Sequence, residues 1–116
     1  MPIRLIPKTD DAAFPYEEAM RLLQANAGIN FKPKDFAPMI AAGTRLGWTV
    51  EMIRANEELA RRGNCFEFAS EKAPFLRGSL FEDNVFFSFS GAKHEHACVP
   101  EIERLAKLLD VRVLRH

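Results

Sequence analysis

A period of two in hydrophobicity marks the clearest segment of the chain, residues 84–90, which read Asn-Val-Phe-Phe-Ser-Phe-Ser. Val85, Phe87 and Phe89 fall on one side of an extended strand. Phe86 falls on the other side and still needs partial cover. The residue types are the β-branched and aromatic ones that strands favour. We therefore predict a central strand here, with other elements covering its apolar side.

The apolar spacing ahead of this strand is helical instead. Tyr16, Met20 and Leu23 recur at the interval of one helix face, and Gly28 is a suitable end. Thr49 has the side chain of an N-cap for a later helix. The sequence predicts three helices over residues 16–27, 35–46 and 50–62, with residues 30–34 as a connection and residues 3–6 as either an edge strand or an ordered arm.

The second half of the chain alternates between short strands and one more helix. Pro100 suits a first helical turn, and apolar residues follow it at helical spacing up to Leu109. Gly78 is a possible β-bulge. The elements expected here are strands over residues 65–69, 75–82, 84–90 and 111–114, a polar loop over residues 91–96 and a helix over residues 100–109.

This order predicts an α+β fold in a single domain over residues 1–116. Three N-terminal helices would precede a small, mainly antiparallel sheet of about four strands, covered by the C-terminal helix. A chain of 116 residues can bury a core without disulfides or metal.

Charge and composition narrow the function classes. Sixteen basic and sixteen acidic residues cancel, whereas partners such as nucleic acid or anionic membrane select a basic excess. We therefore expect neither partner. The two cysteines, Cys65 and Cys98, form no disulfide framework, and no signal peptide or apolar run of membrane-spanning length is present. These features favour a cytoplasmic protein with free thiols.

Residues 42–53 have some features of a DNA-binding helix-turn-helix, with a glycine turn before the threonine that opens the second helix. Glu51, Glu57 and Glu58 would repel phosphates from the reading helix, and Asn56 occupies a usually apolar position. An ordinary helical hairpin is the favoured interpretation, and DNA binding stays an alternative.

A thiol- or metal-dependent protein is a second alternative. His94, His96 and Cys98 lie two residues apart and are weak candidates for metal ligands, although this spacing matches no common zinc motif. Cys98 could be a nucleophile with His96 as its base, but a buried structural thiol is the favoured interpretation. The sequence contains no motif of a known enzyme class, so we expect no catalysis and no cofactor.

Surplus apolar residues are the more informative signal. The chain has ten phenylalanines, and the predicted helix and sheet faces do not obviously bury all of them. A cluster of such side chains on the surface would indicate a protein contact, and an open strand edge beside it would favour a homodimer. The residues predicted to bind a protein are Phe75, Phe81, Phe86 and Leu108.

Two long segments carry a resemblance to a known family. They read RANEELARRGNCFEF and NVFFSFSGAKHEHACVPEIERLAKLLDVRVLRH. With the helical first half, this layout resembles the QslA-type antiactivators of bacterial quorum sensing. The resemblance implies a dimeric cytoplasmic protein without catalysis. It also implies binding to the ligand-binding domain of a LuxR-type transcription regulator, which would block that regulator's own dimerisation and its DNA binding.

Overall fold

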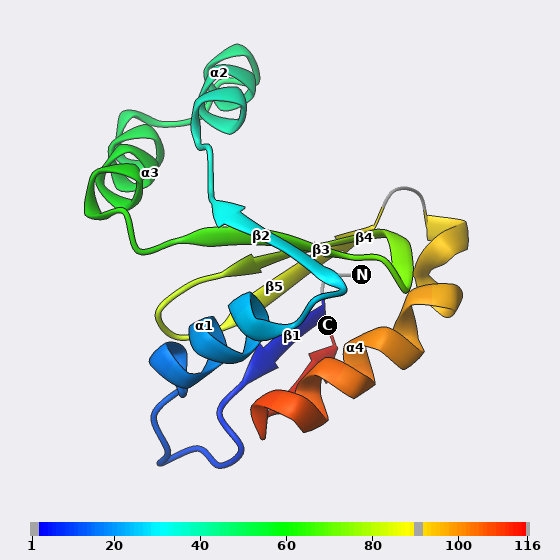
Figure 1. Ribbon diagram of the computed structural model, residues 1–116. Helices are drawn as coiled ribbons and strands as arrows, with labels where there is room; N and C mark the ends of the chain where they lie inside the picture. Colours follow the sequence, from blue (N-terminus) through cyan, green and yellow to red (C-terminus); the bar gives the residue numbers. More distant parts are fainter. Residues whose placement is uncertain (1–2, 90–91, 116) are drawn as a thin grey trace.

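The computed structural model describes residues 3–89 and 92–115, in which helices and strands are interleaved along the chain (Figure 1). Ser90 and Gly91, which fall within the predicted strand and loop, lie outside the described residues. The elements are β1 (Ile3–Ile6), α1 (Tyr16–Ala25), β2 (Ile29–Pro33), α2 (Ala37–Arg45), α3 (Val50–Arg62), β3 (Phe66–Ser70), β4 (Ala73–Leu80), β5 (Val85–Phe89), the 3-10 turn η1 (Ala92–His94), α4 (Glu95–Leu109) and β6 (Arg112–Arg115).

The strands of the described chain form one six-stranded sheet in the order β2-β3-β4-β5-β1-β6. Every neighbouring pair is antiparallel. Strand β5 lies in the interior, between β4 and β1, so the predicted central strand is confirmed. Its Phe87 is 1% exposed, because this side chain points to the covered face of the sheet.

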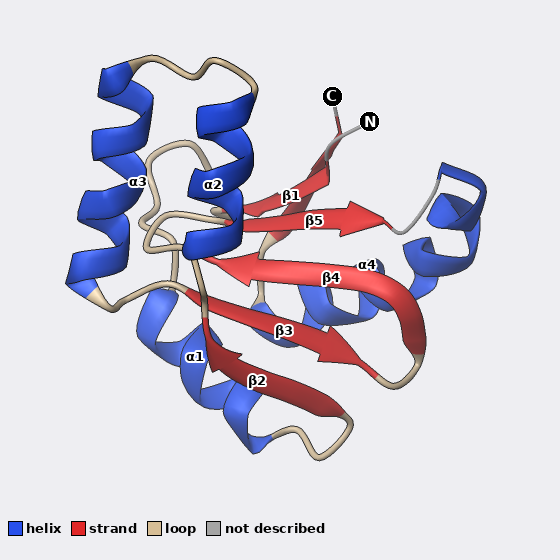
Figure 2. Ribbon diagram, turned by 90° about the horizontal axis from the view of Figure 1, so that it is seen from above, coloured by secondary structure: helices blue, strands red, loops and turns tan. Residues whose placement is uncertain are grey.

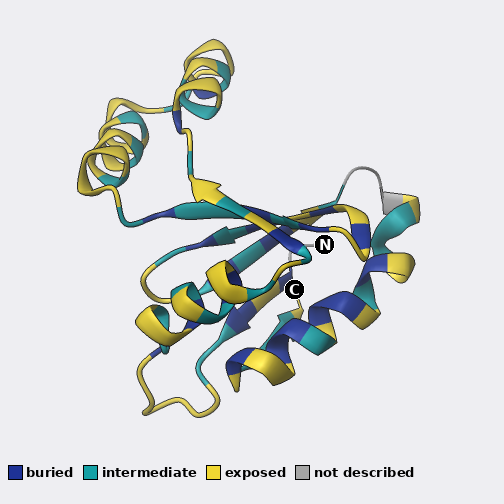
Figure 3. Cartoon of the chain, viewed as in Figure 1, coloured by how far each residue is buried: buried dark blue, intermediate teal, exposed yellow. Residues whose placement is uncertain are grey.

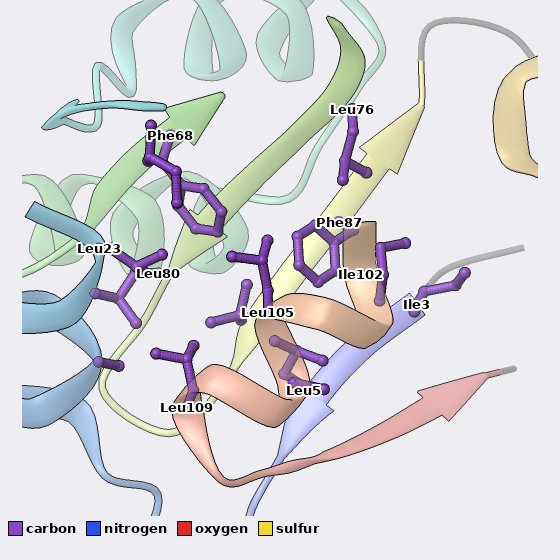
Figure 4. Packing of buried hydrophobic residues seen from close by; sticks show 14 of the residues in the cluster. Ile3, Leu5, Leu23, Phe68, Leu76, Leu80, Phe87, Ile102, Leu105 and Leu109 are labelled. Carbon is purple, nitrogen blue, oxygen red and sulfur yellow. The ribbon is translucent and has the colours of Figure 1, made fainter. Parts of the chain in front are cut away.

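Helices α1 and α4 cover one face of the sheet and close the hydrophobic core (Figure 1, Figure 4). Helix α4 contacts β4 and β6, while α1 contacts β2 and the neighbouring α4. Full burial of one such aliphatic or aromatic side chain contributes roughly 1.5–3 kcal/mol. The fully buried side chains of this core include Ile3, Leu5, Leu23, Leu80, Val85, Phe87, Cys98, Ile102 and Leu105.

The predicted order of elements is wrong. A strand precedes the first helix, a second strand separates α1 from α2, and the sheet has six strands instead of about four. Residues 3–6 are neither an edge strand nor an arm, because they pair with β5 on one side and β6 on the other. Residues 30–34 are no simple connection, because residues 29–33 pair in register with β3 and form an edge of the sheet.

Helix α4 also begins earlier than predicted, at Glu95, and contains Pro100 in its interior. Cys98, Ile102 and Leu105 extend one apolar face back beyond the proline, and all three are buried against the sheet. Burial of this face outweighs the loss of the one backbone hydrogen bond that proline cannot donate.

The predicted bulge at Gly78 is wrong as well. Gly78 pairs regularly with Phe68, and the irregularity lies at Ala69 and Ser70 on the neighbouring strand. The Phe68 ring covers Gly78 so closely that a Cβ atom at position 78 would lie 2.2 Å from it. The glycine therefore admits an aromatic ring to the core face.

Helices α2 and α3 form an antiparallel hairpin on the side of the sheet opposite α1 and α4 (Figure 2). The Thr49 hydroxyl accepts a hydrogen bond from the Met52 amide at 3.2 Å, which confirms the predicted N-cap. Gly63 ends α3 in the left-handed conformation at φ 65°. Gly47 turns the chain between the helices at φ 83°. The hairpin is thus defined at its ends by local sequence.

Among the helices of residues 3–89 and 92–115, none has both the length and the apolar character that crossing a lipid bilayer requires.

Candidate functional site

The second face of the sheet is where polar and aromatic side chains meet. Arg4 on β1 pairs directly with Phe86 on β5, and Phe86 pairs in turn with Ser79 on β4. Directly paired residues point to the same face of an antiparallel sheet. The Arg4 guanidinium carbon lies 5.4 Å from the centroid of the Phe86 ring, a cation–π distance. Three strands therefore present a guanidinium, a ring and a hydroxyl in one row.

A cleft of about 760 Å³ separates this row from the helical hairpin. Its volume lies within the range of about 300–1,000 Å³ that small-molecule sites occupy. The sheet forms the floor and the hairpin the wall, and the β4–β5 turn contributes the rim. The cleft is lined by Arg4, Lys34, Met39, Asn56, Leu59, Arg62, Asn64, Cys65, Ser79, Phe81, Glu82, Asp83, Asn84, Phe86 and Ser88.

Some charged groups in the cleft have an oppositely charged partner, and others do not. Arg62 lies 3.5 Å from Glu82, and the Asn64 amide also donates to that carboxylate. The Lys34 ammonium donates to the Ser79 hydroxyl at 2.9 Å and lies 5.7 Å from the Phe36 ring centroid. Within residues 3–89 and 92–115, no carboxylate lies within ion-pair distance of Arg4 or Lys34. The cleft therefore has two cations available to an anion.

Cys65 contributes a buried thiol to the base of this cleft. Burial raises the pKa of the Cys65 thiol, and the nearby Glu82 carboxylate raises it further. Burial likewise raises the pKa of Tyr16, whose hydroxyl donates to the Asn64 carbonyl at 2.6 Å. Both groups are held in their protonated forms, which disfavours nucleophilic chemistry here.

The tip of the hairpin is the most exposed apolar surface of the described chain. Leu46 is 79% exposed, Val50 57% and Met52 46%. Every residue of α3, all of which the structure describes, is at least partly exposed (Figure 3). We refer to Leu46, Val50 and Met52 as the hairpin tip. A helix with an apolar stripe normally covers that stripe with another element.

The four residues predicted to bind a protein do not form one surface. Phe81 and Phe86 are half-buried and line the cleft. Phe75 is 42% exposed and stacks on His94 with centroids 3.7 Å apart. Leu108 is 37% exposed on α4, which covers the opposite face of the sheet from Phe86. A protein contact through all four would therefore have to span both faces of the sheet.

The weak candidates for metal ligands and the alternative thiol nucleophile lie in different environments. His94 stacks against Phe75, His96 is exposed, and Cys98 is 1% exposed in the core. Burial raises the pKa of the Cys98 thiol, the opposite of what a helix N-terminus would do to an activated cysteine. No group of three His, Cys, Asp or Glu side chains converges on a metal-sized space in the described parts of the chain.

Sequence reasoning missed Arg4, Lys34 and the hairpin tip. Arg4 alternates with Ile3 and Leu5, and this period of two already places it on the face away from the core. No pattern in the sequence indicates that Leu46 and Val50 are exposed, because both residues flank a turn that looks like an ordinary connection between helices.

Comparison of the chain with models of known protein families, with curated proteins and with solved structures finds no match.

Proposed function

We propose that this protein is a non-enzymatic regulator that acts by binding another protein through the hairpin tip. The observation that carries the proposal is the exposure of Leu46, Val50 and Met52 on a hairpin that projects from the sheet (Figure 3). Burying one such side chain in a complex contributes roughly 1.5–3 kcal/mol before the costs of association.

The shape of the hairpin suits a contact of this kind. Thr49, Gly47 and Gly63 fix its ends locally, so its apolar side chains are presented without support from the sheet. Two antiparallel helices can insert an exposed apolar ridge into a groove of a partner. The charged residues around the tip would form the polar rim that surrounds the core of most interfaces.

For the partner we propose the ligand-binding domain of a LuxR-type transcription regulator, in the cytoplasm. Support for this partner comes from the resemblance to the QslA-type antiactivators. An antiactivator needs to cover only the regulator's dimer surface, so it requires apolar contact area and no catalytic group. Inhibition would follow mass action, because the bound regulator is removed from its own monomer–dimer equilibrium.

A homodimer is the second part of this proposal. The edge strands do not favour pairing between copies, since β2 carries Lys32 and Pro33 and β6 carries Arg112 and Arg115. Charged residues and proline on an edge strand oppose the addition of another strand. We therefore assign self-association to side-chain contacts of a helix, and light scattering across a concentration series tests it.

The test is a mixing experiment with the purified ligand-binding domain of a LuxR-type regulator. Size exclusion with light scattering should show the regulator's dimer replaced by a mixed complex. Leu46→Glu combined with Val50→Glu should weaken that complex at least tenfold, because two charges would have to be buried at the contact.

Leu108→Glu is the matched control, since it makes the same apolar-to-acidic change on α4. An unchanged affinity for this variant is expected. Loss of binding with Leu108→Glu and normal binding of the hairpin double variant would overturn the proposal and assign the contact to α4.

A further inference from the structure

We infer that the cleft between the hairpin and the open sheet face is a binding site for a small aromatic carboxylate. This site is separate from the hairpin tip, and its existence does not depend on the proposed protein partner. The inference rests on the lining of the cleft, its charge balance and the hydroxyl group of Ser79.

The floor of the cleft provides an aromatic platform. Phe86 lies between Arg4 and Ser79 on neighbouring strands, with its ring half-buried. Phe81, Met39 and Leu59 also line the space. Apolar side chains from the β4–β5 turn, α2 and α3 thus face the same volume as the ring. A flat aromatic body can contact the rings and the aliphatic side chains together, which is how most small-molecule sites obtain affinity.

The charge balance of the cleft favours a negatively charged ligand. Three cations and two carboxylates line the cleft: Arg4, Lys34 and Arg62 against Glu82 and Asp83. Glu82 is engaged by Arg62 and Asn64, and Asp83 accepts a hydrogen bond from the Asn84 amide at 2.7 Å. The net excess of one positive charge therefore resides with Arg4 and Lys34. A carboxylate between them would receive charge-assisted hydrogen bonds, which are about twice as strong as neutral ones.

The hydroxyl groups of the floor complete the anion site. Ser79 Oγ already accepts a hydrogen bond from Lys34, so its own proton is free to point toward a carboxylate oxygen. Ser88 lines the cleft further along β5 and is exposed.

The experiment uses 6-hydroxy-2-naphthoate as the probe and the full chain as the protein. Its addition should shift the backbone amide NMR signals of Arg4, Ser79 and Phe86 and those of the α3 wall. Two comparison probes separate the contributions. 2-Naphthoate keeps the aromatic body and the carboxylate and should bind with similar affinity, whereas 2-naphthylmethylammonium has the opposite charge and should not bind.

Three variants test the cation pair. Arg4→Gln and Lys34→Met each remove one charge and should weaken binding of 6-hydroxy-2-naphthoate about tenfold, an effect of about 1.4 kcal/mol. Lys107→Met makes the same change in net charge on the exposed surface of α4 and should leave binding unchanged. Leu46→Glu should also leave it unchanged, which separates this site from the proposed protein contact.

Three results would overturn the inference. They are equal binding of the ammonium probe, equal weakening by Lys107→Met, and the absence of cleft signal shifts at millimolar probe.

Discussion

The indole ring of Trp48 packs against Gly43 so closely that a Cβ atom at position 43 would lie 2.2 Å from two ring carbons. The same pair is joined by a backbone hydrogen bond, in which the Trp48 amide donates to the Gly43 carbonyl at 2.9 Å. Gly43 is buried while the rest of the hairpin is largely exposed. This contact fixes the turn that precedes α3.

Gly43→Ala should therefore loosen the hairpin although alanine is the better helix former. Steric overpacking costs about 1–3 kcal/mol, and the gain in helix propensity recovers at most about 1 kcal/mol. Trp48 is the single tryptophan, so a red shift of its fluorescence reports the displacement. Gly28→Ala is the control, because a Cβ atom there would meet only Asn26 Oδ1 at 3.6 Å. A blue shift or unchanged emission for Gly43→Ala would contradict this packing.

Leu105 and Leu108 on α4 provide a second matched pair. Leu105 is 0% exposed in the core, whereas Leu108 is 37% exposed on the outer side of the helix. Leu105→Ala should lower the free energy of unfolding by about 2–5 kcal/mol, the range for cavities in cores. Leu108→Ala should lower it by less than about 1 kcal/mol. Urea denaturation measures both, and similar losses would show that Leu108 belongs to the core.

The ionisation of Glu101 should make the free energy of unfolding depend on pH in the acid range. This carboxylate is 5% exposed and receives hydrogen bonds from Arg104, at 2.5 and 3.0 Å, and from Ser70. Burial alone would raise the pKa of Glu101, but the hydrogen bonds from Arg104 and Ser70 and the Arg104 charge lower it below 4.5. A lowered folded-state pKa stabilises the fold above pH 4.5, and this contribution is lost as pH falls through the folded value.

Glu101→Gln should accordingly reduce stability at pH 7 and flatten the loss of stability below pH 4.5. Glu103→Gln, an exposed neighbour on the same helix, is the control and should retain the acid dependence. Thermal melting between pH 3 and pH 7 measures both variants. An unaltered pH profile for Glu101→Gln would mean that the Ser70 and Arg104 contacts contribute little.

The two thiols should react slowly in the folded protein. Cys65 and Cys98 are 4% and 1% exposed, and burial raises the pKa of each. The thiolate is the reactive form, so an aromatic disulfide reagent at pH 8 should modify both only after denaturant is added. Rapid modification of Cys98 without denaturant would instead revive the alternative of an activated thiol with His96.

The elements that the sequence predicts well are those whose signals are local. Thr49 and Gly63 place the ends of α3, and Val85, Phe87 and Phe89 identify the interior strand. Strand β2 was missed because Asn30, Lys32 and Pro33 are typical of loops. Its Ile29 and Phe31 can be identified as strand residues only from their pairing with β3. Partners distant in sequence, and not local propensity, make this segment a strand.

The candidate sites depend on topology even more strongly. Phe86 was predicted as a surface aromatic, but its neighbour Arg4 comes from a strand more than eighty residues earlier. No local pattern places these two side chains together. The same holds for Phe86 and Leu108, which were both predicted to bind a protein and lie on opposite sides of the sheet.

The position of β1 between β5 and β6 has a consequence for how the molecule acquires its structure. Ile3 pairs with Phe87 on β5 and with Arg115 on β6. Strand β1 therefore forms no sheet hydrogen bonds until these strands, more than eighty residues later in the chain, are present. Such long-range closure slows folding and prolongs the exposure of unpaired strands. The half of the sheet that contains β1 and β6 would then assemble only after β6 has left the ribosome, leaving the nascent β1 strand dependent on rapid completion or on chaperones.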